Sequence, residues 1–319
     1  MTGFRLPKGE RITDQAKGSA ESSLLEVDGR ELKLTNLDRV LYPEAGFTKR
    51  DLIDYYAAVA PVLIPHLRDR PITMRRFPQG VEDDGFWEKQ CPSFRPEWVE
   101  TAPIESDSAG RTVDYCLVND LPTLVWMANL ACIELHVSLA EAVTRARPTA
   151  VVFDLDPGPP ADILDCAEIG LLIHETLASQ NLESFAKVSG SKGIQVYVPL
   201  NTKTDYESTG GFAQALARAF EQEMPDRVVS NMKKSLRRGK VLIDWSQNSE
   251  HKTTVAVYSM RAKATPSVSQ PVRWDALRSA LDRNSPEELR FGPRRVIESI
   301  RAEGDPFGPL LTLEQELPS

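Results

Sequence analysis

The sequence predicts a mixed α/β or α+β fold, and the main observation is the order of its elements. In the second half of the chain, short apolar strands alternate with longer amphipathic helices, which is the pattern of a sheet covered by helices. The composition, 41% hydrophobic and 26% charged, is that of an ordinary globular protein and excludes disordered, collagen-like and disulfide-rich chains. At roughly 150 residues per domain, the 319 residues predict about two domains or one large one.

The N-terminal stretch, residues 1–22, is polar and aperiodic, so we expect a flexible lead-in. Apolar strands at 24–27 and 32–34 then flank Asp28-Gly29, a dipeptide typical of a two-residue hairpin turn. Between positions 82 and 107, eight acidic residues stand against two basic ones. This segment is expected to be loop-rich surface.

A long helix is predicted to begin at Thr48, which has capping-box spacing to Asp51 and precedes a helical apolar period. Pro61 and Pro65 are expected to disturb its far end. The other elements expected before position 150 are strands at 71–77, 112–118 and 132–137 and a buried helix at 121–130. Those expected after it are strands at 150–153, 184–188, 194–199, 241–245 and 254–258, and helices at 161–179, 211–223, 274–281 and 293–301.

The formal net charge is −8, from 38 basic and 46 acidic residues, which argues against a protein that simply coats DNA. Positions 227–263 nevertheless hold nine basic residues and two acidic ones. The charge pattern therefore allows modest, salt-sensitive binding of DNA through local patches.

The most apolar stretch, 121–133, is too short to span a bilayer and contains Asn129, so no membrane helix is expected. The N-terminus has no apolar signal core, from which we expect a cytoplasmic protein. The four cysteines form no C-x-x-C pair, so neither a zinc site nor a redox motif is indicated, and buried reduced thiols are expected.

Asp154 and Asp156 follow an apolar strand at positions i and i+2, so their carboxylates share one face. Close like charges are unfavourable unless a cation lies between them, and hard oxygen ligands suit Mg²⁺ or Mn²⁺. Asp244 ends another apolar strand and completes a candidate triad for two ions about 3.5–4 Å apart. The alternative is that the first two aspartates only begin a turn, because Asp before Pro-Gly is common there.

The segment Ser189-Gly190-Ser191-Lys192-Gly193 is a glycine-rich turn between two strands. It either offers backbone N–H groups and a lysine to an anion or is a hairpin with a solvated lysine. It lacks the spacing of a Walker A loop. Arginines are further candidates for binding phosphates, namely Arg75, Arg76 and Arg261.

Phe86 and Trp87 are adjacent aromatic residues inside the acidic segment, where they either enter the core or stack on bases. His136 ends a predicted strand and is either a core histidine or a ligand contact.

Several segments together resemble one family, the polymerase domain of bacterial ligase D in the archaeo-eukaryotic primase superfamily. The matching segments, in family order, are LTNLDRVLYPEAGFTKRDLIDYY, RPITMRRFPQGV, FWEK, ACIELH, VVFDLDPGP, SGSKGIQVYVPL and IDWSQNSEHKTTVAVYSMRA. They extend from about Leu24 to Pro309. No ligase or phosphoesterase module accompanies them, so we expect a stand-alone form.

The resemblance implies a primase-like α+β fold. It implies one catalytic domain at 23–310, made of an N-terminal α/β unit (about 23–130), an RRM-like catalytic unit (about 131–265) and C-terminal helices (about 271–310), followed by a tail at 311–319.

The same resemblance implies a DNA-dependent nucleotidyltransferase that extends a primer 3′-OH with NTPs, ribonucleotides preferred, or with dNTPs. Its roles would be gap filling, DNA end repair or priming. The partners implied are gapped, primed or broken DNA, the nucleotides, and as candidates a separate DNA ligase and a Ku-type protein, with the chain at the nucleoid when it acts.

By position, the resemblance assigns Asp154, Asp156 and Asp244 to two Mn²⁺ or Mg²⁺ ions. The residues it assigns to the nucleotide are Arg75, Arg76, Phe86, Trp87, His136, Ser189, Lys192, Gln195, Gln247 and Arg261. Those it assigns to the 5′-phosphate of a DNA gap are Asn36, Arg39 and Lys49.

One position departs from the family, because Gln195 stands where a histidine is usual. A neutral amide replaces a donor that can carry charge, and charge-assisted hydrogen bonds are the stronger ones. This predicts weaker nucleotide binding or slower chemistry.

Two other functions are left open. A D-x-D pair after an apolar strand also marks phosphatases of the haloacid-dehalogenase type, although Pro157 stands where threonine or valine is usual. A non-catalytic DNA-end-binding scaffold would explain Gln195 as a sign of lost activity. Phosphate release without primer extension would indicate the first, and DNA binding without nucleotide incorporation would indicate the second.

Overall fold

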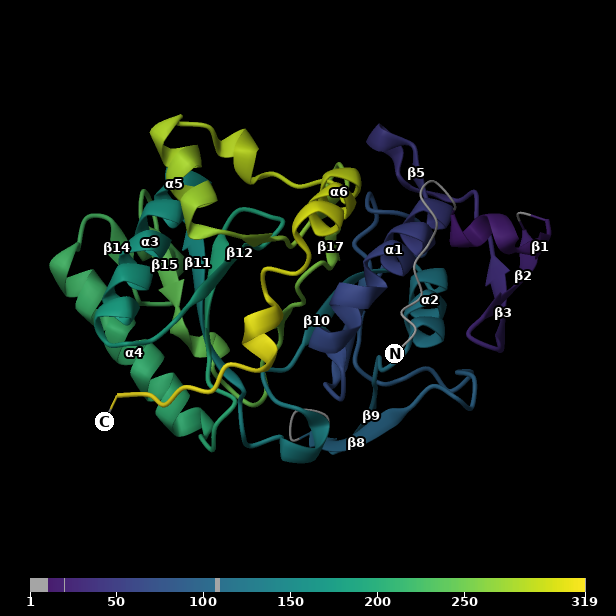
Figure 1. The fold of residues 1–319 in the computed structure, drawn as a ribbon, viewed down its shortest axis with the longest axis horizontal. Helices are drawn as coiled ribbons and strands as arrows, with labels where there is room; N and C mark the ends of the chain where they lie inside the picture. The colour runs from purple at the N-terminus through teal and green to yellow at the C-terminus, as the bar shows by residue number, and fades with distance from the viewer. Residues whose placement is uncertain (1–10, 20, 107–109, 319) are drawn as a thin grey trace. The chain divides into compact units, whose positions relative to one another are not determined.

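The computed structural model describes residues 11–19, 21–106 and 110–318, and the chain divides into two compact units (Figure 1). Unit 1 comprises Met1–Val137, Tyr258–Ser267 and Gly292–Gly304, and unit 2 comprises Ser138–Val257, Val268–Phe291 and Asp305–Ser319. Helices α5 (Trp274–Asp282) and α6 (Pro293–Glu303), expected together as a C-terminal part, belong to different units.

Unit 1 begins with a small antiparallel sheet of β1 (Lys17–Gly18), β2 (Ser22–Val27) and β3 (Arg30–Thr35). Asp28 and Gly29 have positive φ angles between β2 and β3, which confirms the predicted hairpin turn. A short 3₁₀ helix, η1 (Ile12–Gln15), precedes the sheet and buries Ile12. The expected lead-in is therefore structured from Ile12 to Gly18; residues 1–10 and 20 lie outside the described part.

Helix α1 (Lys49–Leu67) begins at the predicted capping box, with Thr48 accepting from the Asp51 backbone N–H and Asp51 from that of Thr48. The helix continues through Pro61 and Pro65, so the expected disturbance does not end it. Both prolines are exposed, and water can therefore take the hydrogen bonds that their missing N–H groups leave open.

The larger sheet of unit 1 has β6 between β10 and β9, with β8 beside β9 and β7 also paired to β6. Its strands are β6 (Ile72–Arg76), β7 (Phe86–Glu88), β8 (Thr101–Ser106), β9 (Arg111–Cys116) and β10 (Cys132–Val137). The other elements of this unit are β4 (Val40–Tyr42), β5 (Phe47–Thr48), α2 (Leu121–Asn129) and β17 (Met260–Arg261). The acidic segment expected to be loop thus contains two strands, β7 and β8, while Asp107 lies outside the described residues.

Two of the four cysteines are joined, contrary to the expectation of reduced thiols. Cys91 and Cys116 form a disulfide, whereas Cys132 and Cys166 are free and buried as expected. The fold brings the pair together because the Cys91 backbone N–H donates to the Asp114 carbonyl of β9 at 2.6 Å.

Unit 2 is built on one six-stranded sheet with the order β14-β15-β11-β13-β12-β19. Its strands are β11 (Ala150–Pro157), β12 (Phe185–Val188), β13 (Ile194–Pro199), β14 (Val228–Val229), β15 (Val241–Asp244) and β19 (Pro271–Val272). Helices α3 (Ile163–Ser179) and α4 (Tyr206–Glu223) pack on the face that presents Val151, Phe153 and Leu155 (Figure 1). The mixed α and β composition confirms the predicted fold class.

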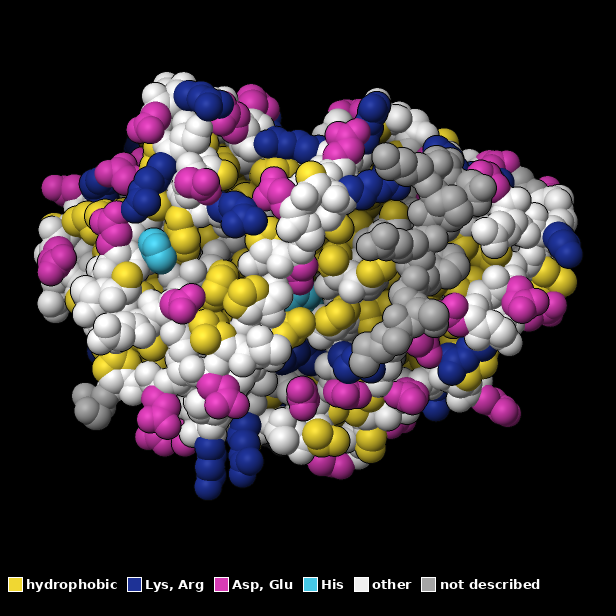
Figure 2. Space-filling model, viewed as in Figure 1, with side chains coloured by type: hydrophobic (Ala, Val, Ile, Leu, Met, Phe, Trp, Pro, Cys, Tyr) yellow, Lys and Arg dark blue, Asp and Glu magenta, His cyan; other side chains and the backbone are white. Residues whose placement is uncertain are grey.

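Short strands β16 (Thr254–Val255) and β18 (Ser267–Val268) complete the described strands, and the strand expected at 254–258 is reduced to two residues. Within the described residues, every helix is too short or too polar to cross a membrane. On the face shown in Figure 2, basic and acidic side chains are interspersed rather than gathered by sign.

Candidate active site

The three predicted aspartates lie on one face of the unit 2 sheet, opposite to the face covered by α3 and α4. Asp154 of β11 is directly opposite Asp244 of β15 and, on its other side, directly opposite Gln195 of β13. Asp156 follows two residues along β11 and so points to the same side. The sheet register therefore brings the predicted triad together from two strands.

The row of carboxylates is electrostatically unfavourable when all its members are ionised. Loss of hydration, followed by repulsion from the nearby Asp156, raises the pKa of Asp154 to about 7. A hydrogen bond from the Gln195 side chain and the positive charge of Lys187 act in the opposite direction. Ionised carboxylate oxygens repel one another, and they are the ligands that hard divalent cations such as Mg²⁺ and Mn²⁺ prefer.

Asp244 is held in place by its own turn. Its carboxylate accepts from the Ser246 backbone N–H at 2.9 Å, from the Ser246 hydroxyl at 2.5 Å and from Gln247 Nε2 at 3.0 Å. Gln247, assigned by sequence to the nucleotide, therefore contacts a carboxylate of the triad. In the described part of the chain, no three acidic, histidine or cysteine side chains already converge as a finished metal-binding group. The three aspartates fit a divalent cation because they offer carboxylate oxygens and lie on the same face of the sheet.

The glycine-rich turn lies beside this row. A Cβ atom on Gly193 would stand 2.0 Å from the Leu155 carbonyl oxygen, so only glycine allows the turn to approach β11 between the two aspartates. The Ser189 hydroxyl accepts from the backbone N–H groups of Ser191 and Gly193, each at 3.3 Å. Ser189 thus closes the turn, and Lys192 is exposed at its tip.

Lys187 was not singled out from the sequence, yet its ammonium is almost fully buried in unit 2, at 1% exposure. It donates to the Val255 carbonyl at 3.0 Å and to the Ser269 hydroxyl at 2.7 Å. It lies directly opposite Gln195 in the sheet, in the same row as Asp154. The signal available in the sequence was a lysine inside an apolar strand, Phe-Ala-Lys-Val.

The arginine and aromatic pairs of unit 1 are divided between the two faces of its sheet. Trp87 is directly opposite Arg75 and Phe86 is directly opposite Arg76, and neighbouring residues of a strand point to opposite faces. The Arg75 guanidinium lies 5.3 Å from the Trp87 ring centre, and that of Arg76 lies 5.1 Å from the Phe86 ring centre. Both rings are exposed, so they are available for stacking.

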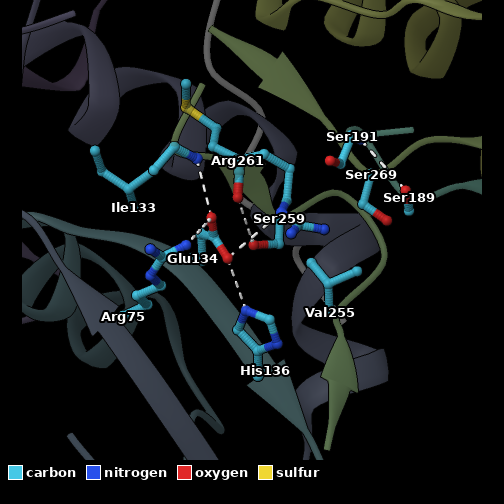
Figure 3. A network of polar contacts seen from close by, with 12 residues as sticks. Arg75, Ile133, Glu134, His136, Ser189, Ser191, Val255, Ser259, Arg261 and Ser269 are labelled. Atoms are coloured by element: carbon cyan, nitrogen blue, oxygen red, sulfur yellow. Dashed lines mark hydrogen bonds and ion pairs between the residues drawn. The ribbon is translucent and has the colours of Figure 1, made fainter. Parts of the chain in front are cut away.

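Three of the predicted phosphate and nucleotide ligands gather on the Arg75 face of unit 1. Figure 3 shows Arg75, His136 and Arg261 turned toward the buried carboxylate of Glu134. Trp87 meets the His136 ring edge to face, with 4.7 Å between ring centres. Glu134 was missed from the sequence, although it is a carboxylate in an otherwise apolar strand, Cys-Ile-Glu-Leu-His.

The predicted 5′-phosphate ligands Asn36, Arg39 and Lys49 belong to unit 1, where the Arg39 backbone N–H donates to the Asn36 carbonyl at 3.1 Å. Lys49 donates to the Asn129 carbonyl at the end of α2 at 2.8 Å, while Arg39 donates to the Pro78 carbonyl at 2.7 Å. Burial, followed by the positive charges of Arg39 and Arg76, lowers the pKa of Lys49 to about 8. The clustered cations can attract an anion, although Lys49 is also a helix-capping donor.

The predicted site residues thus form one set in each unit. Unit 2 holds Asp154, Asp156, Asp244, Ser189, Lys192, Gln195 and Gln247. Unit 1 holds Asn36, Arg39, Lys49, Arg75, Arg76, Phe86, Trp87, His136 and Arg261.

The sequence model of one family, "LigD, primase-polymerase domain", matches residues 48–307. The chain is 38% identical over 281 residues to the multifunctional non-homologous end joining protein LigD of Mycolicibacterium smegmatis, covering 88% of this chain and 36% of that protein. It is 30% identical over 278 residues to the bifunctional LigD of Bacillus subtilis, covering 87% of this chain and 44% of that protein. The chain therefore spans less than half the length of these relatives.

Among solved structures, the fold is similar to the polymerase domain of Mycobacterium tuberculosis ligase D in complex with DNA. The TM-score is 0.81 at 36% identity, and the match covers 89% of this chain and 99% of that one.

Proposed function

The chain belongs to the family of LigD primase-polymerase domains, and from this premise we propose that it is a DNA-dependent nucleotidyltransferase. It extends a primer 3′-OH with ribonucleotides in preference to deoxyribonucleotides, in gap filling, end repair or priming. The observation that carries the proposal is the row of Asp154, Asp156 and Asp244 on one face of the unit 2 sheet. The names of the relatives, which include non-homologous end joining, support a role in repair. As partners we propose a separate DNA ligase and a Ku-type protein.

Asp154, Asp156 and Asp244 would hold two Mn²⁺ or Mg²⁺ ions. Such ions, when bound, stabilise the negative charge that develops in phosphoryl transfer. Gln195 and Gln247 act on the carboxylates themselves, because their amides donate to Asp154 and Asp244 and restrict how these side chains turn. The residues around the triad therefore pre-organise it before substrate arrives.

The nucleotide is bound through its phosphates and its base. In unit 1, Arg75 and Arg261 supply guanidinium N–H donors. In unit 2, Lys192 supplies positive charge, and Ser189 shapes the turn that presents it. Trp87 offers an exposed ring beside Arg75 and His136 for stacking on a base. Arg76 and Phe86 point to the other sheet face, which favours a role with DNA for this second pair.

Asn36, Arg39 and Lys49 would bind the 5′-phosphate on the distal side of a gap. After burial, the positive charges of Arg39 and Arg76 lower the pKa of Lys49, and this accumulation of positive charge around Lys49 supports an anion there.

Incorporation assays test the proposal directly. Labelled primers on primed, gapped and unprimed templates are incubated with ribo- or deoxynucleotides and with Mn²⁺ or Mg²⁺. Template-dependent extension, stronger with ribonucleotides, is expected. DNA binding without any incorporation would instead indicate a scaffold.

A further inference from the structure

The carboxylate of Glu134 is the centre of the polar network in unit 1 (Figure 3). Its Oε1 accepts from Arg75 Nη1 at 3.2 Å and from the Ala262 backbone N–H at 3.0 Å. Its Oε2 lies 2.8 Å from His136 Nε2 and 3.4 Å from Arg261 Nε. Both oxygens are therefore paired, through three hydrogen bonds and an ion pair with Arg261.

The burial of Glu134 would be unfavourable without these partners, because its side chain is 1% exposed. Burial alone raises the pKa of Glu134. The hydrogen bond from His136 and the charge of Arg261 outweigh it and hold that pKa at about 2. Glu134 is thus ionised at neutral pH and has a donor or cation at each oxygen, so it is no candidate for a base.

The donors come from separate parts of the chain. Arg75 belongs to β6, His136 to β10, and Arg261 with Ala262 to β17 and the residue after it. In the β10–β6 pair, Glu134 is directly opposite Arg75, and a register shift between Cys132 and Glu134 marks a bulge, a feature that redirects side chains. One carboxylate therefore joins side chains that are far apart in the sequence.

The contacts also fix the orientation of each partner. An ionised carboxylate only accepts, so Nε2 of His136 carries the hydrogen, which determines the tautomer of the ring. The Arg75 guanidinium lies between two aromatic rings, 4.9 Å from the centre of Phe77 and 5.3 Å from that of Trp87. Two guanidinium charges minus one carboxylate charge leave this group at +1 when His136 is neutral.

We propose that Glu134 is a positioning residue, which holds Arg75, Arg261 and His136 as one binding set for the phosphates of a nucleoside triphosphate. The inference rests on the nucleotidyltransferase function proposed above. Glu134 does not touch the substrate, because its oxygens are already occupied.

The variant Glu134→Gln separates positioning from simple charge neutralisation. It removes the negative charge and nearly keeps the shape. If Glu134 only neutralised the arginines, the set would become more positive and bind a triphosphate more tightly. If Glu134 positions them, binding weakens although the positive charge increases, because the charge-assisted bonds that orient the guanidinium groups are lost.

Calorimetric titration of the full chain with ATP in the presence of Mg²⁺ tests the inference. The Kd for ATP is expected to rise about tenfold or more in Glu134→Gln, and by less in Glu134→Asp, which keeps the charge on a shorter side chain. The control is Glu168→Gln on α3, which removes an exposed carboxylate paired with Arg227 at 2.6 Å and leaves the Kd unchanged.

Two further measurements show that any effect is local. The melting temperature is recorded for each variant, and the Kd for gapped DNA with a 5′-phosphate is expected to stay at the wild-type value. If Glu134→Gln does not fold, the Kd for ATP of Glu134→Asp alone tests the inference. Unchanged or tighter ATP binding by the folded variant overturns the inference. Absence of ATP binding by the wild-type chain contradicts the proposed function itself.

Discussion

At the scale of single residues, the carboxylate row reduces the stability of the folded chain, because folding buries neighbouring groups of like charge. The pKa of Asp154 is raised to about 7 because it is dehydrated and faces Asp156. Between pH 3.8, the ordinary pKa of this carboxyl group, and pH 7, the folded protein keeps a proton on Asp154 that the unfolded chain releases. Stability is therefore lost as pH rises through this window, and the loss is complete above pH 7.

Asp154→Asn is accordingly expected to stabilise the metal-free protein at pH 8, by roughly 4 kcal/mol, and to leave it unchanged below pH 4. Urea unfolding at the two pH values measures the difference. A destabilised variant at pH 8 would show that the carboxylate is satisfied without a cation.

Lys49 gives a second expectation that depends on pH. Its pKa near 8 means that the ammonium loses its charge as pH rises from 7 to 9. The preference for gapped DNA with a 5′-phosphate over a 5′-hydroxyl should therefore fall across this range, and Lys49→Met should reduce the preference at pH 7 by about tenfold. Fluorescence anisotropy with both DNAs measures it.

The matched control for Lys49 is Arg50→Met, which removes the neighbouring basic residue, paired with Asp38 at 3.3 Å. It should keep the preference and its pH dependence. Equal affinities for the two DNAs in the wild-type chain would remove Asn36, Arg39 and Lys49 from the proposed phosphate site.

Residues whose role depends on local pattern could be found from the sequence, and residues whose role depends on tertiary contacts could not. Asp154, Asp156 and Asp244 end apolar strands, a visible signal. Glu134 and Lys187 each interrupt an apolar strand, but apart from His136 the partners named above lie in other strands and other segments. Sequence spacing does not reveal such pairings.

At the scale of elements, strand alternation and the capping box predicted most helices and strands of the described chain. The errors have physical causes. Proline is tolerated on the exposed side of α1 because water replaces the missing hydrogen bonds. The acidic segment was expected to be loop, but β7 and β8 pair with interior strands that supply their stability from outside the segment.

The disulfide leads to a prediction at this scale. Cys91 and Cys116 are 25 positions apart, and closing a loop of this size stabilises a fold by about 3 kcal/mol. Cys91→Ser should therefore lower the free energy of unfolding by about that amount under non-reducing conditions. Under reducing conditions, where the wild-type bond is also open, the difference should be much smaller.

Cys166→Ser is the comparison, since Cys166 is a buried free thiol. Its effect should be the same with and without reductant. If Cys91→Ser behaved like Cys166→Ser, the two sulfurs would not be joined in solution.

At the scale of the whole molecule, the fold class followed from composition and element order, whereas the division into units did not. Residues 258–267 and 292–304 return to unit 1 after the chain has built unit 2. Those returns depend on contacts such as the Tyr55 hydroxyl donating to the Tyr258 carbonyl at 2.7 Å, which periodicity does not encode. The net charge of −8 does not show where charges gather on the surface. On the face shown in Figure 2, acidic and basic side chains are interspersed.

The proposed nucleotidyl transfer requires the carboxylate row of unit 2, and primer extension on gapped DNA with Mn²⁺ is the assay for this requirement. Asp154→Asn and Asp244→Asn should each reduce extension at least a thousandfold or so while binding of the DNA persists. Asp205→Asn, which alters an exposed cap of α4, should extend primers like the wild type. Undiminished extension by either triad variant would show that the carboxylate row is not the catalytic site.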